Sequence, residues 1–206
     1  MKEIISRGFI AVLVFACLFS IPVFAQKTSS TEKQWNALYD SLEKEDWDSA
    51  YSLSSSLLEQ TKTEGEEKSI AKLRYMFLYS AAGRVLSGKM TYDELEKVVK
   101  PFVGTELVLP FRTVLAKCSG GDLNFICAAR EDKTSLLVAA TNQTGTTILA
   151  FEYYKFKDDP NLISLAGSKV SFSGIVKSIQ PNPNRSNLII IRIYLEDAKI
   201  FKTRKK

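Results

Sequence analysis

The chain has 206 residues, with 28 Lys and Arg against 23 Asp and Glu, a net charge of +5, and no histidine. This length suits one large domain or two small ones. The lack of histidine excludes Ser-His-Asp and Cys-His nucleophilic sites and removes both the usual general base at neutral pH and the commonest zinc ligand.

The first 25 residues have the pattern of a cleavable signal peptide. A basic start is followed by an apolar run over residues 9–21 and by small or aliphatic residues before a cleavage site between Ala25 and Gln26. The run is shorter than the about 20 residues of a membrane-spanning helix. We therefore expect a secreted or periplasmic protein with no membrane span after cleavage. An uncleaved membrane anchor and a lipoprotein modified at Cys17 are the alternatives.

A short polar linker, residues 26–31, leads into four segments in which apolar residues recur at helical spacing. The expected helices cover residues 32–44, 47–61, 66–87 and 92–100. Threonine followed three positions later by Gln or Glu marks three of the starts, at Thr31–Gln34, Thr63–Glu66 and Thr91–Glu94. The third helix is apolar on two flanks, so we expect it to lie between neighbouring elements.

Residues 32–62 resemble one tetratricopeptide repeat (TPR). Residues 45–51, with the sequence EDWDSAY, are similar to the turn and the start of the second helix in that family, although Glu45 stands where a glycine is usual. No second copy follows at the period of the family. The resemblance implies a TPR-like unit of about four helices over residues 32–103, which packs against its neighbour or binds a protein. The candidate protein-binding residues are Tyr39, Trp47 and Tyr51.

From residue 104 the pattern alternates, and β-branched and aromatic residues dominate, as is typical of strands. The expected strands cover residues 111–118, 124–129, 135–140, 146–156, 169–179, 188–195 and 199–201. Six or seven short strands predict a small closed β-barrel over residues 104–201. The basic tail, residues 202–206, follows. The predicted fold class is α+β, with the helices first and the strands second.

Residues 165–176, LAGSKVSFSGIV, followed by residues 188–195, resemble the oligonucleotide/oligosaccharide-binding (OB) fold. A strand of pattern G-x-x-V-x-x-x-G-x-V recurs in that fold, and its second glycine, here Gly174, allows a sharp bend. The resemblance covers residues 165–201 and implies an OB-like barrel with a ligand-binding surface. The candidate ligand-binding residues are Lys177, Arg192, Tyr194 and Lys199.

Two cysteines, Cys118 and Cys127, remain after the leader is removed. An even number in an oxidising compartment favours a disulfide, and turn residues separate the two. Two buried free thiols are the alternative. A redox-active pair is disfavoured, since catalytic dithiols are typically two residues apart.

No motif supports catalysis, a cofactor or a metal site. Adjacent acidic residues, at 131–132, 158–159 and 196–197, lie in polar, turn-like stretches where carboxylates are solvated. We therefore expect a non-enzymatic binding protein whose partner is another envelope or extracellular protein. The alternative is a barrel that binds an oligosaccharide, nucleic acid or another anionic polymer. Nucleic acid is disfavoured because the positive charge is mild and an exported protein meets little of it.

Overall fold

The computed structural model describes residues 30–61, 67–119 and 122–204. The predicted leader, with its cleavage site after Ala25, and the Thr63–Glu66 helix start lie outside these residues. Within the described part of the chain, no helix is long and apolar enough to cross a membrane.

The four predicted helices are confirmed, with ends that differ from the expected ones by no more than two residues. They are α1 (Ser30–Glu43), α2 (Trp47–Thr61), α3 (Glu67–Leu86) and α4 (Tyr92–Val99), and a single 3-10 turn (Lys100–Phe102) follows α4. The start of α4 forms the predicted capping box, in which Thr91 accepts from the Glu94 amide while Glu94 accepts from the Thr91 amide.

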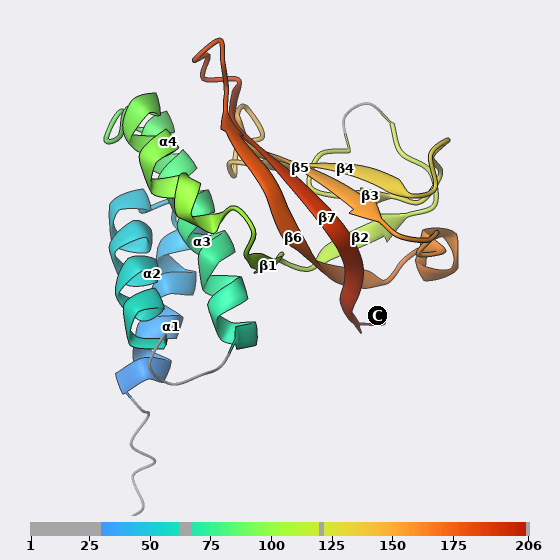
Figure 1. Ribbon diagram of the computed structural model, residues 1–206, viewed down its shortest axis with the longest axis horizontal. Helices are drawn as coiled ribbons and strands as arrows, with labels where there is room; N and C mark the ends of the chain where they lie inside the picture. The colour runs from blue at the N-terminus through green and yellow to red at the C-terminus, as the bar shows by residue number, and fades with distance from the viewer. Residues whose placement is uncertain (1–29, 62–66, 120–121, 205–206) are drawn as a thin grey trace, which may run out of the picture.

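The helices form two layers beside the sheet, with α1 and α2 on the outside and α3 and α4 nearer the strands (Figure 1). Leu38, Leu57 and Leu73, from three different helices, are fully buried in a core of their own. The indole of Trp47 lies directly on Gly83 of α3, where a Cβ atom would come within 2.1 Å of the ring. This close contact lets α2 pack tightly on α3, which then lies between α2 and the sheet, as its two apolar flanks predict.

The β half is a single mixed sheet of seven strands. The strands are β1 (Glu106–Val108), β2 (Arg112–Leu115), β3 (Ile126–Cys127), β4 (Ser135–Thr141), β5 (Ile148–Phe156), β6 (Lys169–Pro181) and β7 (Ile189–Arg204). Their order is β3-β2-β6-β7-β5-β4, with β1 paired to β6. The β2–β3 and β5–β7 pairs are parallel and the other pairs are antiparallel.

The prediction of a closed barrel is wrong, because the sheet stays open between its edge strands β3 and β4. Strand β3 has only two residues, too few for a ladder along β4. The edges meet through Asn124, whose amide donates to the carbonyl of Ala139 and whose side chain bonds to Thr141. A barrel needs a continuous ladder at this point.

Strands β6 and β7 are long and bent, and they pair with each other over most of their length. The register shifts between Ser173 and Ile175, where a Cβ on Gly174 would lie 3.2 Å from the carbonyl oxygen of Glu196. The irregularity thus lies at the glycine for which the sequence predicts a bend, and close approach of two backbones favours glycine there. The two strands predicted at 188–195 and 199–201 are one strand, which continues through Asp197 at a φ of 49°.

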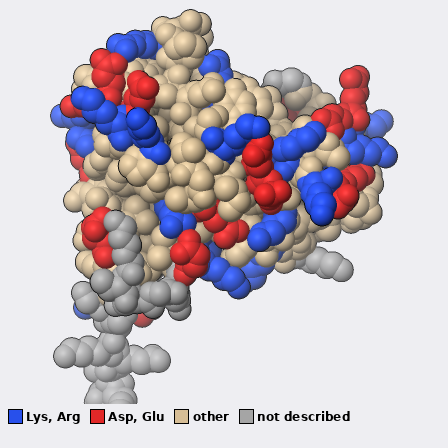
Figure 2. Space-filling model, in the orientation of Figure 1, with Lys and Arg blue, Asp and Glu red and all other residues tan. Residues whose placement is uncertain are grey.

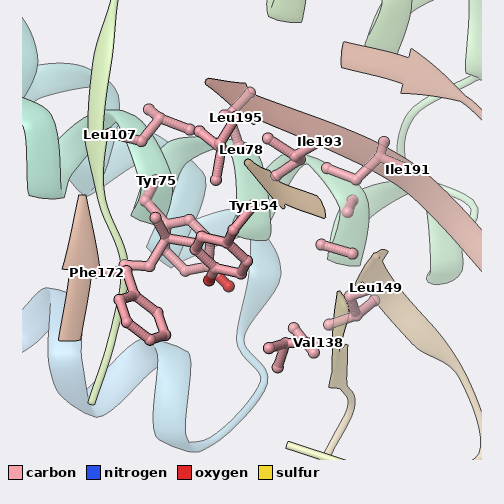
Figure 3. Packing of buried hydrophobic residues seen from close by; sticks show 14 of the residues in the cluster. Tyr75, Leu78, Leu107, Val138, Leu149, Tyr154, Phe172, Ile191, Ile193 and Leu195 are labelled. Carbon is pink, nitrogen blue, oxygen red and sulfur yellow. The ribbon is translucent and has the colours of Figure 1, made fainter. Parts of the chain in front are cut away.

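A shared hydrophobic core joins the helices to the sheet. Leu78 of α3 and Leu195 of β7 belong to one cluster of buried residues that also extends to α4 and to both ends of the sheet. Figure 3 shows Tyr75 of α3 beside Tyr154 of β5, with Phe172 of β6 next to them. The two halves of the sequence therefore fold against each other.

On the outer surface, basic and acidic side chains are interspersed over the face in Figure 2.

The cysteines Cys118 and Cys127 lie at disulfide distance, with Cα atoms 5.7 Å apart. Leu115 of β2 pairs in parallel with Cys127 of β3. The cysteine pair thus joins the chain just after β2 to the short edge strand.

Candidate functional site

Two tyrosines stand side by side on the outer face of the sheet. Tyr153 of β5 and Tyr194 of β7 are direct partners in the parallel ladder, and their rings stack with centroids 4.6 Å apart and planes at 9°. Leu137 of β4 pairs with Tyr153 and is 47% exposed. We call Leu137, Tyr153 and Tyr194 the tyrosine platform. Both tyrosines are half-buried, so the platform offers apolar surface to the solvent.

The tyrosine platform forms part of a shallow hollow of about 650 Å³. Charged side chains line its rim in oppositely charged pairs. These pairs are Lys177 with Glu196 and Lys155 with Asp132, the latter at 3.5 Å. Arg130 also lines the hollow and pairs at 3.5 Å with Asp159, which does not line it. Hydrogen bonds from Ser135 and Thr134 lower the pKa of Asp132, so this carboxyl is ionised at neutral pH. The rim therefore presents both donors and acceptors around an apolar floor.

Three of the four predicted ligand-binding residues lie on this face of the sheet. Lys177 and Tyr194 line the same hollow. Arg192 is two residues from Tyr194 on β7, on the same side of the strand, and pairs across the ladder with Phe151. Lys199 lies farther along β7, beyond the irregularity at Asp197, and forms an ion pair with Glu106 at 3.6 Å. The structure therefore brings Lys177, Arg192 and Tyr194 together and leaves Lys199 apart.

The three candidate protein-binding residues differ in exposure. Trp47 is 7% exposed and packs edge-on against Tyr79, so it belongs to the core. Tyr51 is half-buried between the ring of Phe77, at 4.6 Å, and the guanidinium of Arg84, at 4.7 Å. Tyr39 is 48% exposed. Of the three, Tyr39 alone offers much surface to a partner.

A buried charge cluster under the sheet was missed from the sequence. Arg112 of β2 forms an ion pair with Glu152 of β5 at 2.5 Å, and Glu152 is fully buried. The hydroxyls of Tyr75 and Tyr154 donate to the two oxygens of the same carboxylate, at 2.5 and 2.6 Å. Tyr75 belongs to α3, so this cluster also ties the helices to the sheet. Charges buried in this way require such partners.

The pKa shifts in the cluster fix its protonation. Burial raises the pKa of Tyr75 and of Tyr154 well above the usual value, and the charge of Glu152 adds to the rise. Burial by itself would lower the pKa of Arg112, but the charge of Glu152 and its hydrogen bond with the guanidinium outweigh burial and raise that pKa. The tyrosines therefore stay protonated and the arginine stays charged. An arrangement that holds its protons so firmly is suited to structure and not to proton transfer.

A signal for this cluster was present in the sequence. Glu152 shares its side of the strand with Ala150, Tyr154 and Phe156, so strict alternation places it on the apolar face. Arg112 alternates in the same way with Val114. A charge at such a position on each of two strands indicates a buried pair.

The described residues contain no group of three or more His, Cys, Asp or Glu side chains that could hold a metal ion. Comparison of the chain with protein-family models, with curated proteins and with solved structures finds no match.

Proposed function

We propose that this chain is an exported, non-enzymatic binding protein whose tyrosine platform binds an oligosaccharide. The observation that carries the proposal is the stacked pair Tyr153–Tyr194, exposed in a hollow with paired charges at its rim. The stacked pair presents ring edges to the hollow, which supply apolar surface for the C–H groups of a sugar, and neighbouring charged groups bond strongly to its hydroxyls.

The balance of charge favours a glycan of low charge over a strongly anionic polymer. Lys177 and Lys155, the rim lysines, each have an acidic partner at the same rim. A polyanion would have to displace Glu196 and Asp132, at a cost in electrostatic free energy. Sugar hydroxyls can both donate to the carboxylates and accept from the cations without breaking these pairs.

The connectivity of the sheet supports an OB-like assignment of the β half. The OB fold is a partly open Greek-key arrangement whose second and third strands carry the ligand face. The β4–β5 hairpin, which contributes Leu137 and Tyr153, occupies that position if β1 and β2 together count as the first strand. We assign α1 and α2 as a TPR-like hairpin, which is supported by the buried positions of Trp47 and Ala50.

Export is supported by the cysteine pair as well as by the sequence of the leader. Cys118 and Cys127 lie close enough to form a disulfide, and such bonds persist in secreted and periplasmic proteins and are rare in the cytosol.

Co-sedimentation with insoluble polysaccharides tests the proposed function. We expect the leader-free chain to bind one or more of peptidoglycan, chitin and cellulose. Tyr194→Ala should weaken that binding by about tenfold, because the loss of one ring from a sugar platform costs on the order of 1 kcal/mol or more. Tyr39→Ala is the matched control, since it removes an exposed tyrosine from a helix and should leave binding unchanged.

Retention on a heparin column tests the alternative that the ligand is an anionic polymer. Retention on heparin that falls with Arg192→Ala, together with no binding to the neutral polysaccharides, would show an anionic polymer to be the ligand and contradict the proposal. Equal binding by Tyr194→Ala and the unmodified chain would also contradict it, since the platform would then have no part in binding.

A further inference from the structure

A second and larger cavity lies away from the tyrosine platform. It has a volume of about 1000 Å³ and is lined by α1, α3, the segment that joins β1 to β2, and the end of β7. Pockets that enclose small molecules have volumes of about 300–1,000 Å³. The cavity is therefore large enough for one small organic ligand.

The charges that line this cavity are all of one sign. Its charged lining residues are Lys68, Lys72, Arg112, Lys202 and Arg204, and we call the space they line the basic cavity. No Asp or Glu lines it within the described part of the chain. Arg112 forms an ion pair with Glu152, which does not line the cavity. The other four cations have no acidic partner among the described residues. They are Lys68, Lys72, Lys202 and Arg204. Cations gathered without counter-charges attract an anion.

The remainder of the lining is apolar and aromatic. On α3, Lys72, Met76 and Tyr79 follow one another at helical spacing, so the same face presents a charge and then apolar surface. Across from them, Phe111 stacks under the guanidinium of Arg204 at 4.1 Å, and the ring of Phe201 lies 5.9 Å from the Lys72 ammonium. A ligand held by these cations would therefore also contact rings and aliphatic side chains.

Arg112 also lines the basic cavity, but it is paired with Glu152 and is more buried than the other four cations. Its side chain is 9% exposed, and its Nε is fully buried without a hydrogen-bond partner among the described residues. An unsatisfied charged donor costs free energy in the empty protein. Because this atom has no accessible surface, a ligand in the cavity does not reach it, and the cations that can contact a ligand are Lys68, Lys72, Lys202 and Arg204.

We propose that the basic cavity binds an amphipathic anion, a molecule with one carboxylate, sulfonate or phosphate group on an apolar body. Lys72, Lys202 and Arg204 hold the anionic group, while the side chains of Met76, Phe111 and their neighbours cover the apolar body. The basic cavity shares no lining residue with the hollow of the tyrosine platform, although β7 contributes to both. Its existence does not depend on the oligosaccharide proposal.

A pair of fluorescent probes tests both parts of the proposal. 1-Anilinonaphthalene-8-sulfonate carries an anionic group, and N-phenyl-1-naphthylamine has almost the same apolar body without it. We expect the sulfonate to bind the full leader-free chain with one site per molecule and at least about tenfold more tightly than the uncharged probe. The double variant Lys72→Glu/Lys202→Glu should lower the affinity for the sulfonate by about tenfold or more.

Lys157→Glu is the matched control, because Lys157 is an exposed lysine on the β half that lines neither cavity. It should leave probe binding unchanged. Circular dichroism of each variant checks that the fold is intact. Laurate should displace the bound sulfonate, whereas inorganic phosphate at the same concentration should not, which separates an amphipathic anion from a simple one.

Three results would overturn the inference. Equal affinity for the charged and uncharged probes would show that the anionic group does not contribute to binding. Unchanged sulfonate binding in a folded Lys72→Glu/Lys202→Glu variant would place the probe elsewhere. Displacement by inorganic phosphate as readily as by laurate would show that the apolar lining takes no part. Loss of oligosaccharide binding in Tyr194→Ala with unchanged probe binding would show the two sites to be separate.

Discussion

Three donors converge on the carboxylate of Glu152, which has no contact with solvent. Its charge is balanced by Arg112, and the remaining acceptor capacity is used by Tyr75 and Tyr154. Such a cluster stabilises the fold only while every member is present, since the loss of one partner leaves another charge buried and uncompensated. Replacement of Glu152 tests this dependence most directly.

We expect Glu152→Gln to lower the free energy of unfolding by about 3–5 kcal/mol, because Arg112 then stays buried without a counter-charge. Urea unfolding followed by circular dichroism measures the change. Glu196→Gln, at an exposed rim position, is the control and should change stability by no more than about 1 kcal/mol. A loss below about 1 kcal/mol for Glu152→Gln would mean that Arg112 reaches solvent.

The buried tyrosines predict a loss of stability at alkaline pH. Burial raises the pKa of Tyr79 from 10.0 to about 12, and burial also raises the pKa values of Tyr75 and Tyr154 well above the usual value. Above pH 10 the unfolded chain releases these protons while the folded protein keeps them, so unfolding becomes more favourable as pH rises. The stability that these protonated tyrosines contribute is fully present below pH 10. It is lost as the pH rises toward the pKa values of the tyrosines in the folded protein.

Urea unfolding at a series of alkaline pH values measures this dependence. Tyr79→Phe is the matched variant, since it removes one of the raised groups and should make the decline with pH less steep. An identical decline in Tyr79→Phe and in the unmodified protein would show that other groups cause it.

At the level of elements, the contact between Trp47 and Gly83 controls how α2 packs on α3. In most helices Gly→Ala stabilises by about 0.5–1 kcal/mol. Here an alanine Cβ would lie 2.1 Å from the indole, so Gly83→Ala forces the two helices apart. We expect a loss of about 1–3 kcal/mol in unfolding free energy, typical of overpacking.

The double variant Gly83→Ala/Trp47→Leu tests this explanation. Because leucine is smaller than tryptophan, the added methyl should cost less in that background, and the difference is the coupling energy between the two positions. Additive effects of the two substitutions would contradict a direct clash. Thermal unfolding of the four proteins in the cycle provides the measurement.

The helices were predictable from the sequence because their signals are local. Thr91 and Glu94 fix one start by themselves, and the apolar spacing of α3 identifies its two packed flanks. The strands β4 to β6 were also identified, since alternation is local as well. Strand β1 was missed, because it has three residues and forms only by pairing with Ser173–Ile175, far along the chain. Whether the sheet closes likewise depends on how the edge strands β3 and β4 meet in space, and no local sequence pattern predicts that.

The candidate site was predictable only in part, for the same reason. Tyr194 and Lys177 were identified by charge and aromatic character, but the stacking of Tyr194 on Tyr153 depends on the parallel register of β5 and β7. Lys199 was placed with them because the irregularity at Asp197 was not visible in the sequence. The basic cavity was not predicted, since it is formed by segments from both halves of the chain.

At the scale of the whole molecule, the helical and β halves share one core and are joined by polar contacts as well. The hydroxyls of Tyr75, Tyr79 and Tyr92 donate to Glu152, to the carbonyl of Thr141 and to the carbonyl of Ser186, respectively. These contacts favour a change of secondary structure near residue 104 over a boundary between units that fold independently. Separation of the halves would expose apolar surface on α3 and on the sheet together.

We therefore expect the protein to unfold in one cooperative transition. Both tryptophans, Trp35 and Trp47, lie in the helical half, and Trp47 is part of the shared core. Their fluorescence therefore reports the helices and their packing, while hydrogen exchange of the β6 and β7 amides reports the sheet. The urea dependence of the two signals should give the same midpoint, which is the test for a two-state transition. The fragment 104–206 should not fold by itself, because Tyr75, Leu78 and α4 would no longer cover its core. Two separate midpoints, or a folded fragment with protected β6 and β7 amides, would instead show that the sheet is an independent domain and that the basic cavity is a cleft between domains.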